Sequence, residues 1–201
     1  SFIGKLNPSP NLNLSVQVVF THYWTSITPY YGINSQNDRF LTISNYWRNN
    51  QSCIHRDLVI VLTDEILPGA KGISTGKMCD DSKYEFGYAT INTSQPGDWV
   101  AIAHEIGHNL GVGLHTDQTS CANLCNTTCS LMCSVLSCSN SNPSVNQVTI
   151  DPCSLGTLKN KLDVLKNKCY NCIDSIIQPH GNSSCESCLE HVEIDLNSYL
   201  I

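Results

Sequence analysis

Hydrophobic residues recur along this 201-residue chain with two periods, which predict where strands and helices lie. Leu14–Phe20 (LSVQVVF) alternates apolar and polar residues and is rich in β-branched side chains, so it predicts a strand. A continuous apolar run, Leu58–Leu62, lies within His55–Thr63 and predicts a buried strand. Gly72–Cys79 and Tyr84–Ile91 predict two further short strands.

Apolar residues at helical spacing mark three helices, Asp38–Arg48, Trp99–Leu110 and Leu155–Lys168. A residue that favours the N-cap position lies at or just before the start of each helix. These residues are Asn37 or Asp38 for the first, Asp98 for the second and Ser154 for the third. Residues 115–152 show no period, and we expect irregular structure tied by disulfides there. Strands that alternate with helices, followed by one C-terminal helix, indicate an α/β sandwich.

Composition and charge exclude some partners. A net charge of −6 argues against nucleic acid or an anionic membrane as the main partner. No apolar run approaches the roughly 20 residues of a membrane-spanning helix, so we expect no membrane span. The chain begins at Ser1 without an initiator Met, which is typical of a mature or excised product.

Cysteines indicate an oxidising compartment. Ten of the twelve fall between Cys121 and Cys188, a density typical of disulfide frameworks. Five Asn-x-Ser/Thr sequons agree with this, at Asn13, Asn50, Asn92, Asn126 and Asn182. We therefore expect a glycosylated protein that is secreted, or on the extracellular face of a membrane-anchored precursor. The alternative is a cytosolic protein with structural zinc.

The stretch that carries chemistry is HEIGHNLGVGLH, residues 104–115. On a helix, His104 and His108 are four residues apart, so their imidazoles project from one face and can bind one metal ion together. Glu105 lies beside them and can take a proton from the water that the metal binds. Gly111 can adopt the left-handed geometry that ends a helix, which lets the chain turn back and bring in His115 as a third ligand. Three protein ligands with an open fourth position are typical of a catalytic zinc site.

At HEIGHNLG the sequence resembles the metzincin metallopeptidases, most closely the reprolysin branch that includes the ADAM and snake-venom enzymes. Three further stretches carry the resemblance: Ser130-Leu131-Met132 resembles the Met-turn, Asp151-Pro152-Cys153-Ser154 the closing segment, and Gly72–Cys79 the substrate-flanking edge strand. The resemblance covers about residues 14–172. It implies a metzincin-like sandwich with a twisted mixed sheet, an active-site helix and a C-terminal helix.

The resemblance also implies a function, namely a zinc endopeptidase that hydrolyses peptide bonds of extracellular proteins. Glu105 would serve as general base, one catalytic Zn²⁺ as cofactor, and Met132 as a packing residue beneath the histidines rather than a ligand. A protein or peptide is the expected substrate, and the chain is expected to act as a monomer. The family also allows a Ca²⁺ ion near the closing helix, although its upstream ligand would come from outside this sequence.

The third ligand departs from the family spacing. The family places it three residues after the motif glycine, where this chain has Leu114, which has no lone pair to give a metal. A one-residue bulge, made easier by Gly113, would still bring His115 to the zinc. Asp117 is the fallback ligand, because carboxylates also bind zinc. The remaining alternative is a distorted or metal-free site. This departure is also the only sequence feature that favours a second function class, a binding or adhesion module that keeps the fold and has lost catalysis.

The two ends of the chain also depart from the pattern. The family has another strand and a long helix before Leu14–Phe20, and here they are absent, replaced by residues 1–13, or part of a precursor outside this sequence. Residues 1–172 form the expected catalytic domain. Residues 173–201 are a cysteine-rich tail or the start of a further module.

Disulfide connectivity stays open at the level of sequence. By resemblance, Cys79 pairs with a cysteine near the closing helix, Cys169 being the preferred one, and Cys153 with Cys121, Cys125 or Cys129. The pairs Cys169-x-x-Cys172 and Cys185-x-x-Cys188 have the spacing of a four-thiolate zinc site, but in a secreted protein we expect them to be oxidised.

Overall fold

A computed structural model describes residues 21–25, 27–51, 58–63, 71–74, 87–92, 98–127, 129–134 and 148–168. The longer elements in these ranges are α2 (Gln36–Asn50), β1 (Leu58–Thr63), β2 (Gly72–Ser74), β3 (Gly87–Asn92), α3 (Asp98–Asn109) and α5 (Pro152–Lys168). Between α3 and α5 lie the short elements η1 (Thr116–Gln118), α4 (Leu124–Thr127), β4 (Cys129–Ser130) and β5 (Val148–Thr149).

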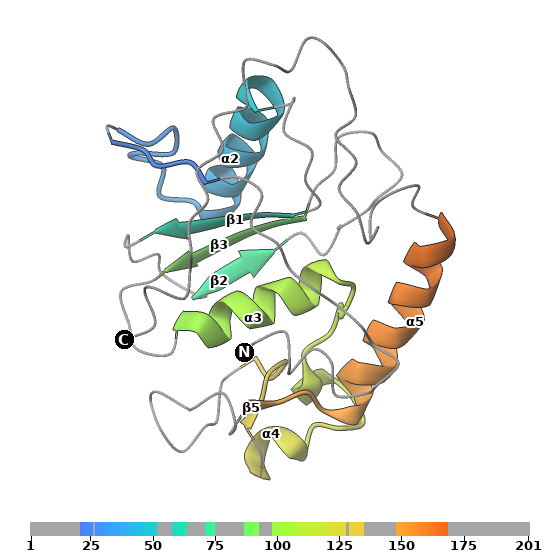
Figure 1. Cartoon of the computed structure of the whole chain (residues 1–201). Coiled ribbons are helices and arrows are strands. Elements are labelled where there is room, and N and C mark those ends of the chain that lie inside the picture. Colours follow the sequence, from blue (N-terminus) through green and yellow to red (C-terminus); the bar gives the residue numbers. More distant parts are fainter. Residues whose placement is uncertain are drawn as a thin grey trace, which may run out of the picture.

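The first three strands form a mixed sheet in the order β1-β3-β2. β1 pairs parallel with β3, and β2 pairs antiparallel with β3, with Gly72 opposite Ile91. Within the described residues β2 is therefore an edge strand, as the resemblance of Gly72–Cys79 implied. The sheet lies between α2 on one side and α3 on the other (Figure 1). This mixed α/β arrangement agrees with the predicted fold class.

The side chains of β1 point alternately to the two faces of the sheet, which explains why a helix packs on each face. Val59 and Val61 are buried in a cluster with residues of α2, whereas Leu58 and Ile60 pack against the cluster beneath the sheet that includes α3. Successive side chains of a strand point to opposite faces, so a continuous apolar run can serve both layers. The prediction of a fully buried strand is wrong for Leu62, which is 53% exposed.

Two helices begin at residues other than those predicted. Ser35, rather than Asn37 or Asp38, caps α2: its backbone is extended and its side chain accepts a hydrogen bond from the Asp38 N–H. Asp38 is instead in the first turn, where its charge is favourable near the positive end of the helix dipole. Asp98 is the first residue of α3 rather than the residue before it.

The closing helix α5 begins at Pro152, three residues before the predicted start. Proline suits the first helical position because its missing N–H would have no partner there. Asp151 precedes it, and its carboxylate accepts the backbone N–H of Ser154 at 2.9 Å. The cap is therefore Asp151, and the prediction of Ser154 as cap is wrong. Leu158 of this helix is buried in the same cluster as Ile106 and Met132.

Residues 115–134 are more regular than predicted, because η1, α4 and β4 form there. Disulfides hold them, as expected: Cys121 pairs with Cys153 and Cys125 with Cys133. Cys121 is one of the three partners that the sequence left open for Cys153. Cys129 is also in a disulfide.

Several predictions lie outside the described residues. These are the strand Leu14–Phe20, the second half of Gly72–Cys79, the pairing of Cys79 with Cys169, the cysteines Cys172, Cys185 and Cys188, and the tail 173–201. Within the described ranges, no helix combines the length and the apolar character needed to cross a membrane.

Candidate metal centre

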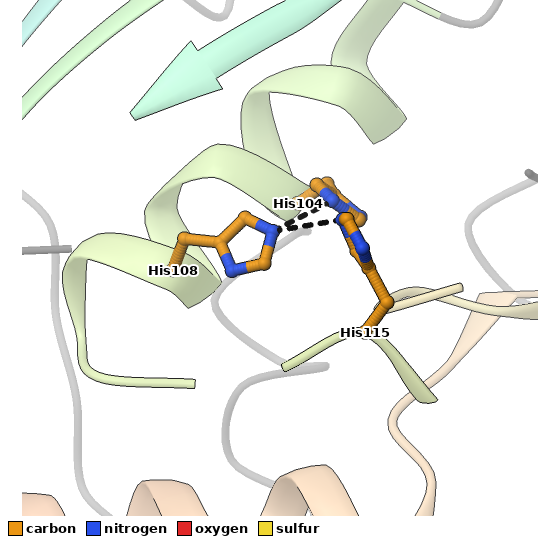
Figure 2. Close-up of side chains that lie close together, drawn as sticks. All are labelled: His104, His108 and His115. Atoms are coloured by element: carbon orange, nitrogen blue, oxygen red, sulfur yellow. Dashed lines mark hydrogen bonds between the residues drawn. The ribbon is translucent and has the colours of Figure 1, made fainter. Parts of the chain in front are cut away.

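Helix α3 carries the first two histidines on one face. Val100, Ala103 and Ile106 are buried beneath the sheet, which fixes the rotation of the helix about its axis. His104 and His108 then project together, because residues four apart lie on one face. Figure 2 shows both rings near the end of this helix.

A glycine ends α3 and turns the chain towards the third histidine. Gly111 has a φ of 104°, a conformation that side chains rarely adopt. The N–H of Val112 bonds to the carbonyl of Gly107, and the N–H of Gly111 bonds to that of His108, which is the hydrogen-bond pattern of a Schellman motif. The turn uses Gly111 as predicted. Gly113 has no positive φ, so its conformational freedom is not what makes the turn.

The three histidines converge on one point. Their ligand atoms lie within 4.8 Å of one another, with His108 Nε2 at 3.0 Å from His104 Nε2 and 3.2 Å from His115 Nε2 (Figure 2). The structure thus brings together two residues of a helix and one residue that lies beyond its end.

The hydrogen bonds of Nδ1 in His104 and His108 determine whether Nε2 of each ring has a free lone pair. His104 Nδ1 lies 2.7 Å from the carbonyl oxygen of Leu131, and His108 Nδ1 lies 2.5 Å from that of Val112. A carbonyl only accepts, so each Nδ1 carries the proton and donates it. In a neutral ring Nε2 then has a lone pair, and two lone pairs that face each other at 3.0 Å need a cation between them.

The pKa values of both rings favour this neutral form. Burial lowers the pKa of His104 to about 4 and also lowers that of His108 below its usual value of 6.5. Both rings are therefore neutral at pH 7, with the proton on Nδ1 and a lone pair on Nε2, and able to act as ligands.

The spacing also fits a metal. A tetrahedral zinc ion with Zn–N bonds of about 2.0–2.1 Å holds two ligand nitrogens about 3.3 Å apart. The Nε2 distances of 3.0 and 3.2 Å are close to this value. Three imidazole nitrogens are also the donor set that suits zinc among the common divalent cations. The residues present therefore fit one zinc ion.

Asp117, the fallback ligand, is not part of this cluster and bonds to Ser134 instead. Its carboxylate accepts the backbone N–H of Ser134 at 2.8 Å and the hydroxyl of Ser134 at 2.7 Å. These hydrogen bonds lower the pKa of Asp117 below its usual value. The described residues that could hold a metal here are the three histidines, without Asp117. The extra residue, Leu114, is 59% exposed and does not block the approach of His115.

Glu105 lies between α3 and the edge strand. It is buried, and a Cβ placed on Gly72 would be 2.5 Å from its Oε1. Burial raises the pKa of Glu105 to about 7, against a hydrogen bond with the Ser74 side chain that lowers it. A carboxyl group with this pKa exchanges a proton readily at neutral pH.

Met132 is packed under the histidine helix. Its side chain is 1% exposed, and its sulfur would be 2.5 Å from a Cβ on Gly107, the residue between the two helical histidines. The neighbouring Leu131 supplies the carbonyl that His104 contacts. The turn at 130–132 therefore supports the metal centre from below.

Three residues near the site were not predicted to contribute to it: Gly72 and Ser74, which contact Glu105, and Thr116, which hydrogen-bonds Asp151. The Asp-Pro pair at 151–152 is a recognisable helix start, so a cap at Asp151 could have been predicted. No local pattern signals the partners of Thr116 or of Gly72, because they come from distant segments.

Comparison with known proteins gives the family. A reprolysin family model, described as Metallo-peptidase family M12, matches residues 7–148 and so spans both α3 and the third histidine. Among curated proteins no significant match was found. The match covers more than half of the 201 residues and agrees with the histidine cluster and the mixed α/β fold. The chain therefore belongs to metallopeptidase family M12 and is a reprolysin-like metzincin.

Proposed function

We propose that this protein is a zinc-dependent endopeptidase that cleaves extracellular proteins. The observation that supports the proposal best is the convergence of three Nε2 atoms, two of them on rings whose Nδ1 protons are already donated to backbone carbonyls. Such a set of preoriented lone pairs has no structural purpose without a cation. Membership of family M12 supports zinc as that cation and peptide hydrolysis as the reaction.

In this proposal His104, His108 and His115 hold the ion and leave its fourth position open. A zinc ion bound there supplies Lewis acidity, which lowers the pKa of water and polarises the scissile carbonyl. Glu105 accepts the proton of the attacking water and returns it to the leaving amine. Its contact with β2 holds the carboxylate next to the strand that resembles the substrate-flanking edge of the family.

The proposal that the substrate is extracellular is based on the disulfide-bonded cysteines. Within the described residues, two disulfides enclose the segment that follows His115, and such cross-links persist in oxidising compartments. The sequons at Asn50, Asn92 and Asn126 support the same location. The protein is accordingly proposed to be secreted, or to face the cell exterior.

One experiment tests this function. Purified protein is analysed for metal and incubated with an unstructured protein substrate, with and without a chelator. We expect about one zinc per chain, cleavage at internal peptide bonds, and loss of cleavage with the chelator that added zinc restores. Either stoichiometric zinc without cleavage or the absence of bound zinc would contradict the peptidase and would instead favour the inactive binding module.

A further inference from the structure

Thr116, the residue directly after His115, is held at two points. Its backbone N–H donates to the carbonyl of Met132 at 2.8 Å, and its hydroxyl donates to Asp151 Oδ2 at 2.6 Å. Its side chain is completely buried. A residue adjacent to a metal ligand is thus fixed to the segment that begins the closing helix.

Asp151 uses its two oxygens for different purposes. Oδ1 accepts the Ser154 N–H and so caps α5. Oδ2 accepts the hydroxyls of Thr116 and, at 2.9 Å, of Ser130. Asp151 is 3% exposed, and a buried carboxylate is tolerated only when hydrogen bonds compensate its desolvation. One side chain therefore joins η1, β4 and α5 behind the metal centre.

The segment before His115 offers no comparable support. A Cβ on Gly113 would meet no atom within 4 Å, and Leu114 is 59% exposed. This is the segment with the extra residue, and packing of Gly113 or Leu114 does not fix where His115 lies. The contacts on its far side are made by Thr116 and by Gln118, whose side chain accepts the His115 N–H at 3.2 Å.

We propose that Asp151 is a positioning residue for the metal centre, which acts through the Thr116 hydroxyl to hold His115 against His104 and His108. This inference rests on the proposed function, since it assumes that the three histidines bind zinc. The hydroxyl of Thr116 compensates for the longer spacing of the third ligand. The N-terminus of the closing helix thereby sets the geometry of the site.

The test measures zinc affinity and stability separately in four proteins. Thr116→Val removes the hydroxyl at nearly constant volume, and Thr116→Ser restores it. Ser154→Ala is the matched control, because it removes another buried hydroxyl that bonds to Asp151 but belongs to α5 rather than to the residue next to His115. This hydroxyl also lies 3.4 Å from that of Thr116, so the control keeps the direct bond from Thr116 to Asp151 and changes only its surroundings. Zinc dissociation constants are measured by competition with a chromophoric chelator, and melting temperatures are measured without metal. The visible spectrum of the Co²⁺ form reports coordination geometry.

Loss of an outer-shell partner costs about 10–100-fold in metal affinity. We expect Thr116→Val to weaken zinc binding at least about tenfold and to alter the Co²⁺ spectrum, whereas Thr116→Ser and Ser154→Ala stay within about threefold of wild type. Equal weakening in Thr116→Val and Ser154→Ala would overturn the positioning role, because it would reflect the fold alone.

If Thr116→Val is not recovered folded, Thr116→Ala replaces it, because its smaller side chain leaves room for a water beside Asp151. Wild-type zinc affinity in either variant would contradict the positioning role while leaving the proposed function intact. A wild-type protein that binds no zinc would overturn both.

Discussion

Gly72 of the edge strand lies so close to Glu105 of α3 that a Cβ at position 72 would be 2.5 Å from the carboxylate oxygen and 2.8 Å from Cγ. Real Cβ atoms essentially never approach other atoms so closely. Only glycine therefore allows β2 and the proposed general base to occupy their present positions. The edge strand holds this side chain as well as flanking the site.

Gly72→Ala should lower the rate of peptide hydrolysis at least about tenfold, because the new methyl group displaces the Glu105 carboxylate and misplaced catalytic groups are costly. Zinc content should not change, since the three atoms nearest to this Cβ all belong to Glu105 rather than to a histidine. The control is Gly113→Ala, where a Cβ meets no atom within 4 Å. Equal rates in the two variants would show that the position of Glu105 does not depend on the edge strand.

Glu105→Ala should abolish proteolysis while zinc stays bound. A positioned general base contributes about 10²–10⁴-fold to a rate, so residual cleavage should fall by at least about 100-fold. Metal analysis and a cleavage assay on the same preparation check this. Wild-type activity in the variant would show that another group moves the proton.

His115→Ala should weaken zinc binding far more than Asp117→Ala. The first change removes a proposed ligand and should exceed the roughly 10–100-fold loss that outer-shell changes cause. The second removes only the hydrogen bonds to Ser134. Zinc affinities obtained by chelator competition decide the order, and the reverse order would mean that the ligand assignment is wrong.

Gly107→Ala should destabilise the protein, because overpacking a core costs about 1–3 kcal/mol and the gain of alanine over glycine in a helix offsets only up to about 1 kcal/mol of this. The added Cβ would meet the buried sulfur of Met132 at 2.5 Å. Gly156→Ala in α5 is the control, because its Cβ meets nothing within 4 Å and alanine favours a helix by up to about 1 kcal/mol. Chemical denaturation of both variants should give changes of opposite sign, and a neutral Gly107→Ala would contradict the close packing of Met132.

Acid should weaken the hydrogen bonds that Thr116, Ser130 and Ser154 donate to the Asp151 carboxylate. Burial raises the pKa of Asp151, but hydrogen bonds from Thr116, Ser154 and Ser130 outweigh it, so the pKa lies below its usual value of 3.8. A depressed folded-state pKa gives stability that is complete above the unfolded pKa and is lost as pH falls through the folded one. The free energy of unfolding should therefore drop below pH 3.8 more steeply in wild type than in Asp151→Asn. Parallel pH curves for the two proteins would argue against this ionised cap.

Local sequence was sufficient to predict α3, the helix that carries His104, Glu105 and His108. The 3.6-residue period predicted α3, and Cβ geometry alone requires that positions four apart share a face. The continuous apolar run predicted β1, although not the exposure of Leu62, which depends on what packs above that end of the strand. Helix starts were predicted less well, because Ser35 and Asp151 become caps only through the backbone conformation that tertiary packing gives them.

The sequence by itself determined the chemistry, because the residue types and spacing of HEIGHNLG specify a metal-binding helix with a carboxylate beside it. The sequence favoured His115 as the third residue of the set and kept Asp117 as the fallback, and the tertiary structure brings His115 beside the other two histidines. His104 takes its backbone partner 27 residues away at Leu131, and Thr116 takes its carboxylate 35 residues away at Asp151. Contacts between such distant segments depend on how α3, the turn at Met132 and α5 pack together. No local pattern records that packing, so the sequence alone could not exclude Asp117. The structure shows that His115, and not Asp117, lies with the other two histidines.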